Sequence, residues 1–400
     1  MRDRYAALAL ATVAMLVNFW AWGLLSPLAP GYESDLRLGS TQVSVLVAVP
    51  VIIGSLGRIP LGALTDRFGG HRVFSAATFA CVLPVVWLAF AANYGALIAG
   101  AILLGIGGAT FAIGVPFVNS WFPPAQRGLA LGIFGVGNAG TAIAGFVAPW
   151  ASDAFGRPAV FWMVAAALVL IGVLFLLLGR DTPERTGAPT PMLRRSLDAW
   201  RLRASKELAG FYAITFGGFV AFGVYLPLYL RNAYRLEAGD AALRAAGFIV
   251  LATLARPVGG FLADRMGGLR PLRVMLAMIA ACAVVVSFTP VMAIATTAFL
   301  LMAMALGAAN GAVFGMVAER VPTQQVGAVT GVVGAAGGLG GFLPPIVMGA
   351  VYGATGSYAI GLMLLSDLAL AALVYSVFVM SPGRPRRTAD STSRVAGAGI

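Results

Sequence analysis

Long apolar stretches, separated by short charged or Pro/Gly-rich breaks, run along nearly the whole chain. A helix of about 20 apolar residues spans the ~30 Å hydrocarbon core of a bilayer, and most of the stretches reach that length. The first is too long for the apolar core of a secretory signal, so it too is predicted to cross the membrane. The pattern predicts an all-α membrane protein with 12 transmembrane helices, at approximately 5–29, 40–64, 73–91, 95–120, 128–150, 159–179, 207–230, 244–263, 272–290, 294–317, 327–351 and 356–380.

The predicted helices fall into two sets of six. Residues 1–180 form the N-terminal six-helix half and residues 207–380 form the C-terminal half. Residues 181–206, which are polar and basic, are expected to connect the halves as a cytoplasmic loop. Residues 381–400 have the composition of a disordered cytoplasmic tail.

The two halves share motifs at matching positions. The stretch GRIPLGALTDRFGGHR (57–72) returns in the second half as ARPVGGFLADRMGGLR (255–270). The alignment places Arg58 on Arg256, Gly62 on Gly260 and Asp66 on Asp264. A second pair of motifs, at 121–135 and 320–334, matches at nearly the same spacing. This repeat predicts two pseudo-symmetric halves in parallel orientation.

Composition and charge agree with this interpretation. Hydrophobic residues make up 60% of the chain and charged residues 10%, which excludes an ordinary soluble core. With an internal N-terminus, 20 of the 27 Lys and Arg fall in cytoplasmic segments, and the positive-inside rule predicts that both termini are cytoplasmic. The net charge of +12 is then explained by membrane topology and not by nucleic-acid binding. The basic residues left outside are Arg37, Arg157, Arg231, Arg235 and Arg244.

The sequence contains no cluster of His, Cys or acidic residues and no phosphate-binding loop. Cys81 and Cys282 both lie within predicted helices and are interpreted as small buried residues. We therefore expect no enzymatic activity, no metal site and no cofactor.

Two arginines stand inside apolar helices. The stretch from Arg58 to Asp66 is about 12 Å long as a helix, and the same holds from Arg256 to Asp264. If the aspartates mark one membrane face, both arginines lie near the midplane, where a cation costs at least ~2.5–3.5 kcal/mol and needs a partner. A buried ion pair is one alternative, but only Asp367 lies deep in an apolar run. The pattern favours a bound, transported anion.

Glycines recur at three- and four-residue spacing in GIFGVGNAGTAIAGF (132–146) and GVVGAAGGLGGFLPP (331–345). Such strips let helices approach closely, and bare backbone can also approach a small ligand. A guanidinium is a planar fork that binds two oxygens of an oxyanion at once. Two forks from opposite halves therefore suit a small planar anion.

Two six-helix halves joined by a basic loop resemble the major facilitator superfamily (MFS). Within it, GVGNAG and GAAGGLGGF resemble the two nitrate signatures of the nitrate/nitrite porter (NarK-type) family, whose members also carry one arginine on helix 2 and one on helix 8. The resemblance implies an MFS fold and transport of nitrate and nitrite across the bacterial inner (cytoplasmic) membrane. The expected partners are a small inorganic anion (nitrate or nitrite) and the lipid bilayer. The protein is expected to be a monomer.

The resemblance also implies a substrate pocket by motif position. Helix packing is the alternative role for its aromatic residues. The pocket residues are Arg58, Arg256, Asn138, Tyr212 and Phe216 from FYAITFGGF, Phe111 from GATF, and Gly337 from the second glycine strip.

The loops TDRFGGHR and ADRMGGLR resemble the superfamily's cytoplasmic signature between helices 2–3 and 8–9. This resemblance implies gating roles for Asp66, Arg67, Asp264 and Arg265. The two aspartates are expected to latch neighbouring helix ends.

Competing functions differ in features that the sequence carries or lacks. A proton-coupled drug exporter is expected to have an acid on a central helix and a proline in the helix 5 glycine motif, and neither is present. An oxalate/formate-like exchanger is expected to have a basic residue on helix 11, but 327–351 contains none. A membrane receptor or sensor would need a signalling domain, for which the central loop has no room.

Two modes of coupling remain open. Two unpaired arginines that face each other in a dry site repel, and a bound anion relieves this repulsion. The loaded carrier is then expected to change state more readily than the empty one, which favours nitrate/nitrite antiport. Proton symport would instead need a titrating group near the site, and Asp367 is the residue on which that alternative depends.

Overall fold

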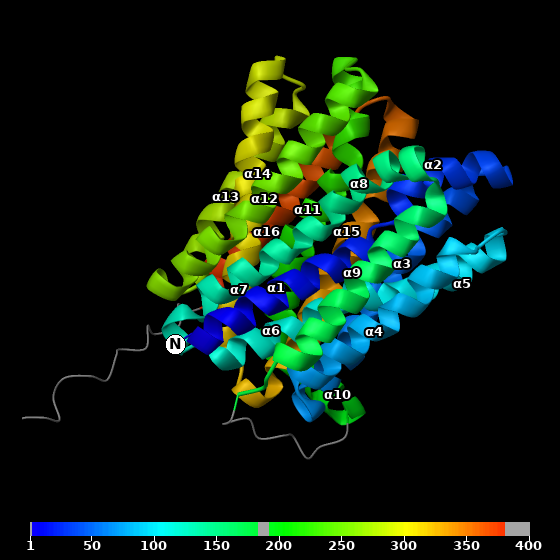
Figure 1. Ribbon diagram of the computed structural model, residues 1–400. Coiled ribbons are helices and arrows are strands. Elements are labelled where there is room, and N and C mark those ends of the chain that lie inside the picture. Colours follow the sequence, from blue (N-terminus) through cyan, green and yellow to red (C-terminus); the bar gives the residue numbers. More distant parts are fainter. Residues whose placement is uncertain (1, 183–191, 381–400) are drawn as a thin grey trace, which may run out of the picture.

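The computed structural model describes residues 2–182 and 192–380, which are almost entirely helical (Figure 1). Within these ranges, 11 helical segments are long and apolar enough to cross a membrane. The count is 12 if Arg203–Gly223 and Tyr225–Tyr234, bent by 51°, form one span. The all-α membrane fold predicted from the apolar pattern is therefore confirmed.

The first half of the chain contains several spans that are built from two helical pieces. Its elements are α1 (Arg2–Trp22), α2 (Leu25–Leu36), α3 (Ser40–Phe68), α4 (Gly70–Ala89), α5 (Tyr94–Ala109), α6 (Phe111–Trp121), η1 (Pro124–Gln126), α7 (Arg127–Gly135), η2 (Val136–Asn138), α8 (Ala139–Phe155) and α9 (Arg157–Leu178).

The second half has longer helices, one of which is bent within its span. Its elements are α11 (Arg203–Tyr234), α12 (Ala238–Met266), α13 (Leu269–Ser287), α14 (Met292–Arg320), η3 (Thr323–Gln325), α15 (Val326–Thr355) and α16 (Ala359–Phe378), and α10 (Met192–Arg201) precedes them.

The connection between the halves contains a helix that the sequence analysis treats only as loop. This helix, α10, contacts α3 and α15 and lies at the same end of the molecule as the N-terminus (Figure 1). Residues 183–191 and the predicted disordered tail, 381–400, lie outside the described residues. The predicted boundaries of the halves remain predictions.

The predicted fifth span is interrupted at Asn138. Its side-chain Nδ2 donates a hydrogen bond of 2.7 Å to the carbonyl oxygen of Gly135, within the 3-10 turn η2. Side chains that bond to their own backbone compete with the regular helical pattern. The fifth span is therefore one span, Pro124–Phe155, in which a short 3-10 segment separates α7 from α8.

Each repeated loop turns on a glycine with positive φ. Gly69 ends α3 at φ 97° and Gly267 ends α12 at φ 76°. Only glycine adopts such φ values without strain. The backbone conformation thus explains why both loops have glycine at this position.

The two halves meet where glycine helices pack on arginine helices. α3 packs against α15, and α7 packs against α12. A β-carbon on Gly62 would collide with the carbonyl oxygen of Gly327, and one on Gly260 would collide with that of Gly128. The glycines of the repeated motifs therefore allow backbone-to-backbone contact between the halves.

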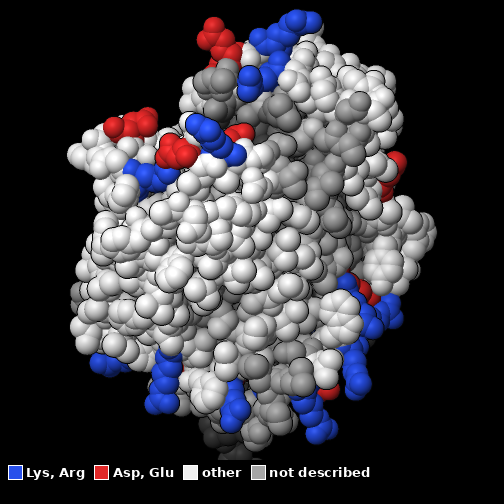
Figure 2. Space-filling view, turned by 90° about the vertical axis from the view of Figure 1, so that its right-hand side faces the viewer, with Lys and Arg blue, Asp and Glu red and all other residues white. Residues whose placement is uncertain are grey.

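The surface is divided into zones of charge. Figure 2 shows a broad uncharged belt, with mostly Lys and Arg along its lower rim and charges of both signs along its upper rim. A belt of this kind suits the hydrocarbon core of a bilayer. The sidedness inferred from the positive-inside rule stays a prediction.

We predict that Gly260→Ala lowers the midpoint of thermal unfolding by about 2–8 °C, because overpacking costs about 1–3 kcal/mol. The matched control is Gly247→Ala on the same helix, where nothing lies within 4 Å of the added methyl group. Alanine favours a helix more than glycine does, so this variant should equal or exceed the wild type. Thermal unfolding of the detergent-purified protein, followed by tryptophan fluorescence, measures both. Equal midpoints for the two variants would contradict the close-contact explanation.

Candidate functional site

The two arginines singled out by the repeat are buried in the interior, one on each half. Arg58 on α3 is 1% exposed, and Arg256 on α12 is 2% exposed. Across the described residues, the ion pairs do not include either arginine. Asp367, the one acid deep in an apolar run, is exposed on α16. Neither cation is therefore paired with a carboxylate among the described residues.

Each arginine reaches a glycine carbonyl across the boundary between the halves. Arg58 Nη1 donates to Gly334 on α15 at 2.6 Å, and its Nε donates to Gly108 at 3.1 Å. Arg256 Nη1 donates to Gly135 on α7 at a long 3.5 Å. A β-carbon on Gly334 would lie 2.9 Å from Cδ of Arg58, and one on Gly135 would lie 3.0 Å from Cδ of Arg256. The glycine strips thus make room for the arginines.

The two cations differ in how fully they are bonded. Arg256 has two buried donors, Nε and Nη2, with no hydrogen-bond partner among the described residues. Buried polar groups in proteins are nearly always hydrogen-bonded, so donors of this kind indicate a place where a ligand is bound. Arg58 is held more firmly because two of its nitrogens have carbonyl partners.

A single aromatic ring joins the two guanidinium groups. The Phe216 ring centroid lies 5.5 Å from Cζ of Arg58 and 5.4 Å from Cζ of Arg256. These are cation–π distances, which stabilise a charge that lacks an anionic partner. Arg58 has the same relation to Phe111, at 5.5 Å.

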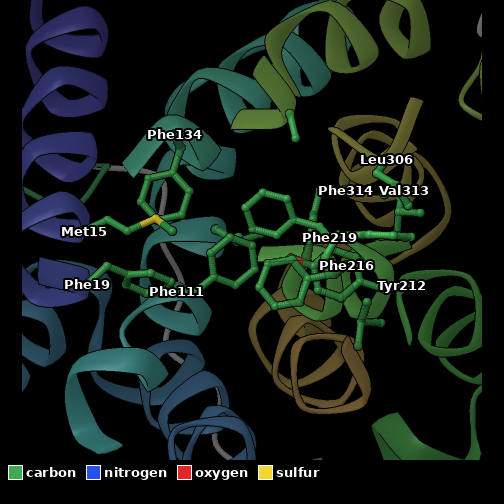
Figure 3. Close-up of a cluster of buried hydrophobic side chains, with 14 of the residues drawn as sticks. Met15, Phe19, Phe111, Phe134, Tyr212, Phe216, Phe219, Leu306, Val313 and Phe314 are labelled. Atoms are coloured by element: carbon green, nitrogen blue, oxygen red, sulfur yellow. The ribbon is translucent and has the colours of Figure 1, made fainter. Parts of the chain in front are cut away.

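The aromatic rings around the arginines form a near-parallel array. Tyr212 lies parallel to Phe216, with centroids 4.9 Å apart and an interplanar angle of 9°. Phe111 is parallel to Tyr212 at 6.4 Å and 9°. Figure 3 shows these rings facing one another between the two halves. The sequence-predicted aromatic residues are therefore brought together.

Three further phenylalanines belong to the array, although the sequence analysis does not identify them. A phenylalanine in an apolar helix has no distinguishing pattern, so its position in space is the only signal. Phe314 stands edge-on to Phe111 and Tyr212 at 4.8 Å from each, Phe134 stacks on Phe111 at 5.7 Å, and Phe219 lies 5.4 Å from Cζ of Arg256.

The remaining predicted pocket residues also lie here. Asn138 is buried, and it shares the Gly135 carbonyl oxygen with Arg256. A β-carbon on Gly337 would collide with the Tyr212 ring, so this glycine permits the ring to pack. The structure thus gathers residues from both halves around one place.

The predicted gating aspartates lie at the end of the molecule that carries α10. Asp66 accepts from the backbone N–H groups of Gly327 and Ala328 at 3.0 and 2.9 Å, at the start of α15. Asp264 accepts from Gly128 and Leu129, both at 2.7 Å, at the start of α7. A carboxylate at a helix N-terminus binds free N–H groups and the positive end of the helix dipole. Each aspartate therefore binds a helix of the opposite half.

The arginines beside the aspartates do not join these contacts. Arg67 and Arg265 are exposed and lie over the rings of Phe68 and Phe261, at 5.0 and 4.3 Å. A different arginine, Arg195 on α10, pairs with Asp66 at 3.1 Å and also contacts the carbonyl oxygen of Gln324. Arg195 is only one of many basic residues in the connecting segment, so the sequence does not distinguish it.

The sequence is similar to those of known membrane transporters. The Major Facilitator Superfamily profile matches residues 11–345. A protein named probable nitrate/nitrite transporter NarK2, from Mycobacterium tuberculosis, is 44% identical over 384 residues, covering 94% of this chain and 96% of the relative. The nitrite extrusion protein of Bacillus subtilis is 38% identical over 391 residues, covering 98% of each chain.

Solved structures share the fold at low identity. The human organic anion transporter MFSD10 superposes with a TM-score of 0.78 at 15% identity, over 93% of this chain and 99% of its own. The E. coli fucose:proton symporter FucP gives 0.75 at 16% identity, over 94% and 99%. All four of these proteins are membrane transporters and not enzymes. The profile match over residues 11–345 and the two sequence relatives show that the chain belongs to the major facilitator superfamily and, within it, to the nitrate/nitrite porter family.

Proposed function

We propose that the protein carries nitrate and nitrite across the bacterial inner membrane by alternating access, with the anion held between Arg58 and Arg256. The observation that carries this proposal is a pair of buried guanidinium groups, one from each half, that share the Phe216 ring and have no carboxylate partner among the described residues. A cation buried in a membrane interior needs compensation, and a monovalent anion between the two supplies it.

The shape of the site suits a flat oxyanion. A guanidinium can offer parallel N–H donors to two oxygens, and Arg256 keeps Nε and Nη2 without a partner among the described residues. The parallel rings of Phe111, Tyr212 and Phe216 suit a planar ligand. Asn138 adds an amide beside Arg256. The names of the relatives, which are nitrate/nitrite transporter and nitrite extrusion protein, support nitrate and nitrite as the anions.

The aspartates provide the gate in this proposal. Asp66 and Asp264 join the halves at the end bearing α10, so opening the site toward that end requires their bonds to break. We also assign Arg67 and Arg265 to this gate, where both side chains are exposed to solvent. The mostly basic lower rim supports a cytoplasmic location for this end and for both termini (Figure 2). Both arginines of the site come from one chain, which supports a monomer as the working unit.

Antiport of nitrate and nitrite is the favoured coupling. Closing the halves without an anion would leave two positive charges close together in a medium of low dielectric constant, whereas a bound anion offsets about half of that charge. Proton symport is the alternative, and it requires a titrating group beside the arginines. Asp367 is exposed on α16, which supports antiport.

We predict that proteoliposomes containing the protein exchange labelled nitrate for internal nitrite, and that external nitrite and chlorate compete better than formate or oxalate. Arg58→Lys and Arg256→Lys should each lose at least about 90% of this counterflow, because lysine keeps the charge but lacks the planar fork. Arg244→Lys, at an exposed position on α12, is the matched control and should behave as the wild type. Counterflow near the wild-type level in either site variant would rule out the forked clamp.

The gate generates a second prediction. Asp66→Asn should lower the turnover number about tenfold while changing the apparent affinity for nitrate less than threefold. The substitution removes a charge-assisted contact between the halves, and this contact lies away from Arg58 and Arg256. Turnover and half-saturation in counterflow separate the two effects. Asp35→Asn, which removes an exposed ion pair with Arg157, should leave both unchanged. A pure loss of affinity in Asp66→Asn would argue against a gate.

Coupling is tested in proteoliposomes that contain no internal anion substrate, under an inward proton gradient. Antiport predicts little accumulation of nitrate until nitrite is loaded inside, which should raise the initial rate at least about tenfold, since the unloaded site resists closure. Strong accumulation without internal anion, abolished by Asp367→Asn, would establish proton symport instead.

A further inference from the structure

A second buried amide side chain lies in the C-terminal half. Asn310 on α14 is 1% exposed, and neither its Nδ2 nor its Oδ1 has a hydrogen-bond partner among the described residues. An amide with both groups unpaired is unfavourable in a protein interior, where polar groups are nearly always satisfied. The proposed roles of the arginines and Asn138 do not account for this residue.

The backbone contact next to Asn310 sets its depth. Gly311 packs so tightly on α12 that a β-carbon there would collide with the carbonyl oxygen of Arg256. Asn310 therefore lies at the level of Arg256, within the membrane interior and far along the chain from either end of α14, which runs from Met292 to Arg320.

Helical geometry sets the direction of its side chain. Residues one turn apart share a face of a helix. Leu306 lies one turn before Asn310, and Val313 and Phe314 lie one turn after it. All three belong to the cluster around Tyr212 and Phe216 (Figure 3). Asn310 thus projects from the face of α14 that is turned toward the aromatic array.

We propose that Asn310 is a substrate-binding residue whose Nδ2 donates a hydrogen bond to the third oxygen of nitrate. This inference rests on the proposed function. The unpartnered Nε and Nη2 of Arg256 stay free for the anion, and Asn310 adds a further unpaired donor at the level of Arg256. Asn138 differs because its Nδ2 already donates to the Gly135 carbonyl oxygen.

The third contact makes Asn310 a specificity-determining residue. Nitrite has two oxygens, which the free Nε and Nη2 fork of Arg256 can bind together. Nitrate has a third oxygen outside that fork, which a further donor can bind. A neutral amide supplies that donor without adding charge, so it strengthens nitrate binding more than nitrite binding.

The test compares Asn310→Leu, which preserves side-chain size without hydrogen bonding, with Asn310→Ser, which keeps a smaller donor. Titration calorimetry of the detergent-purified protein measures the dissociation constants for nitrate and nitrite. The leucine variant should lose about tenfold in nitrate affinity, as for one hydrogen bond to a charged group, and less than about threefold in nitrite affinity. The serine variant should retain more nitrate affinity than the leucine variant.

A matched control is Asn119→Leu, which changes another fully buried asparagine near the far end of α6 from Phe111. It should leave the nitrate-to-nitrite affinity ratio unchanged. The proposal is overturned if that ratio is unchanged in the Asn310 variants, or if leucine binds nitrate better than serine, as a packing role predicts. If the leucine variant does not fold, a ratio unchanged in the serine variant alone overturns it. Failure of the wild type to bind either anion would instead refute the proposed function.

Discussion

Burying two guanidinium charges between the halves is the constraint on which the rest of the interior depends. Neither cation has a carboxylate partner among the described residues, so the protein surrounds them with weaker groups. Carbonyl oxygens of Gly334, Gly108 and Gly135 accept their N–H groups, and the Phe216 ring faces both. These contacts offset part of the cost of burial and leave donors on Arg256 unused. These unused donors make the site suitable for an anion.

The site and the aspartate contacts repeat one arrangement along the same helices. In each half, one helix contributes both an arginine and an aspartate to the glycine-rich helix of the other half. Arg58 and Asp66 of α3 bind α15, and Asp264 of α12 binds α7, which Arg256 also approaches. The glycines bring these backbones into contact, so one separation of α3 from α15 breaks the aspartate bonds and the arginine bond together. Geometry of this kind would couple the proposed anion site to the proposed gate.

The contacts depart from the pseudo-symmetry of the two halves in two places. Arg195 of α10 pairs with Asp66, whereas the described residues contain no ion pair to Asp264, so the two aspartate contacts differ in strength. Asn310 has no asparagine at the matching place in the first half, and it accompanies the less fully bonded arginine.

The sequence by itself determined the membrane fold, the repeat and the identity of the two arginines, because hydrophobic length, motif spacing and the cost of a buried cation are properties of the chain alone. It also indicated Asn138, Tyr212, Phe216 and Phe111 through family motifs. Only the tertiary structure decided which groups surround the cations. Phe314, Arg195 and Asn310 have no distinguishing pattern in the sequence, since a phenylalanine in an apolar helix, an arginine in a basic segment and an asparagine beside glycines are ordinary there. Their proposed roles depend on where residues far apart in the chain lie in space, which local pattern does not encode.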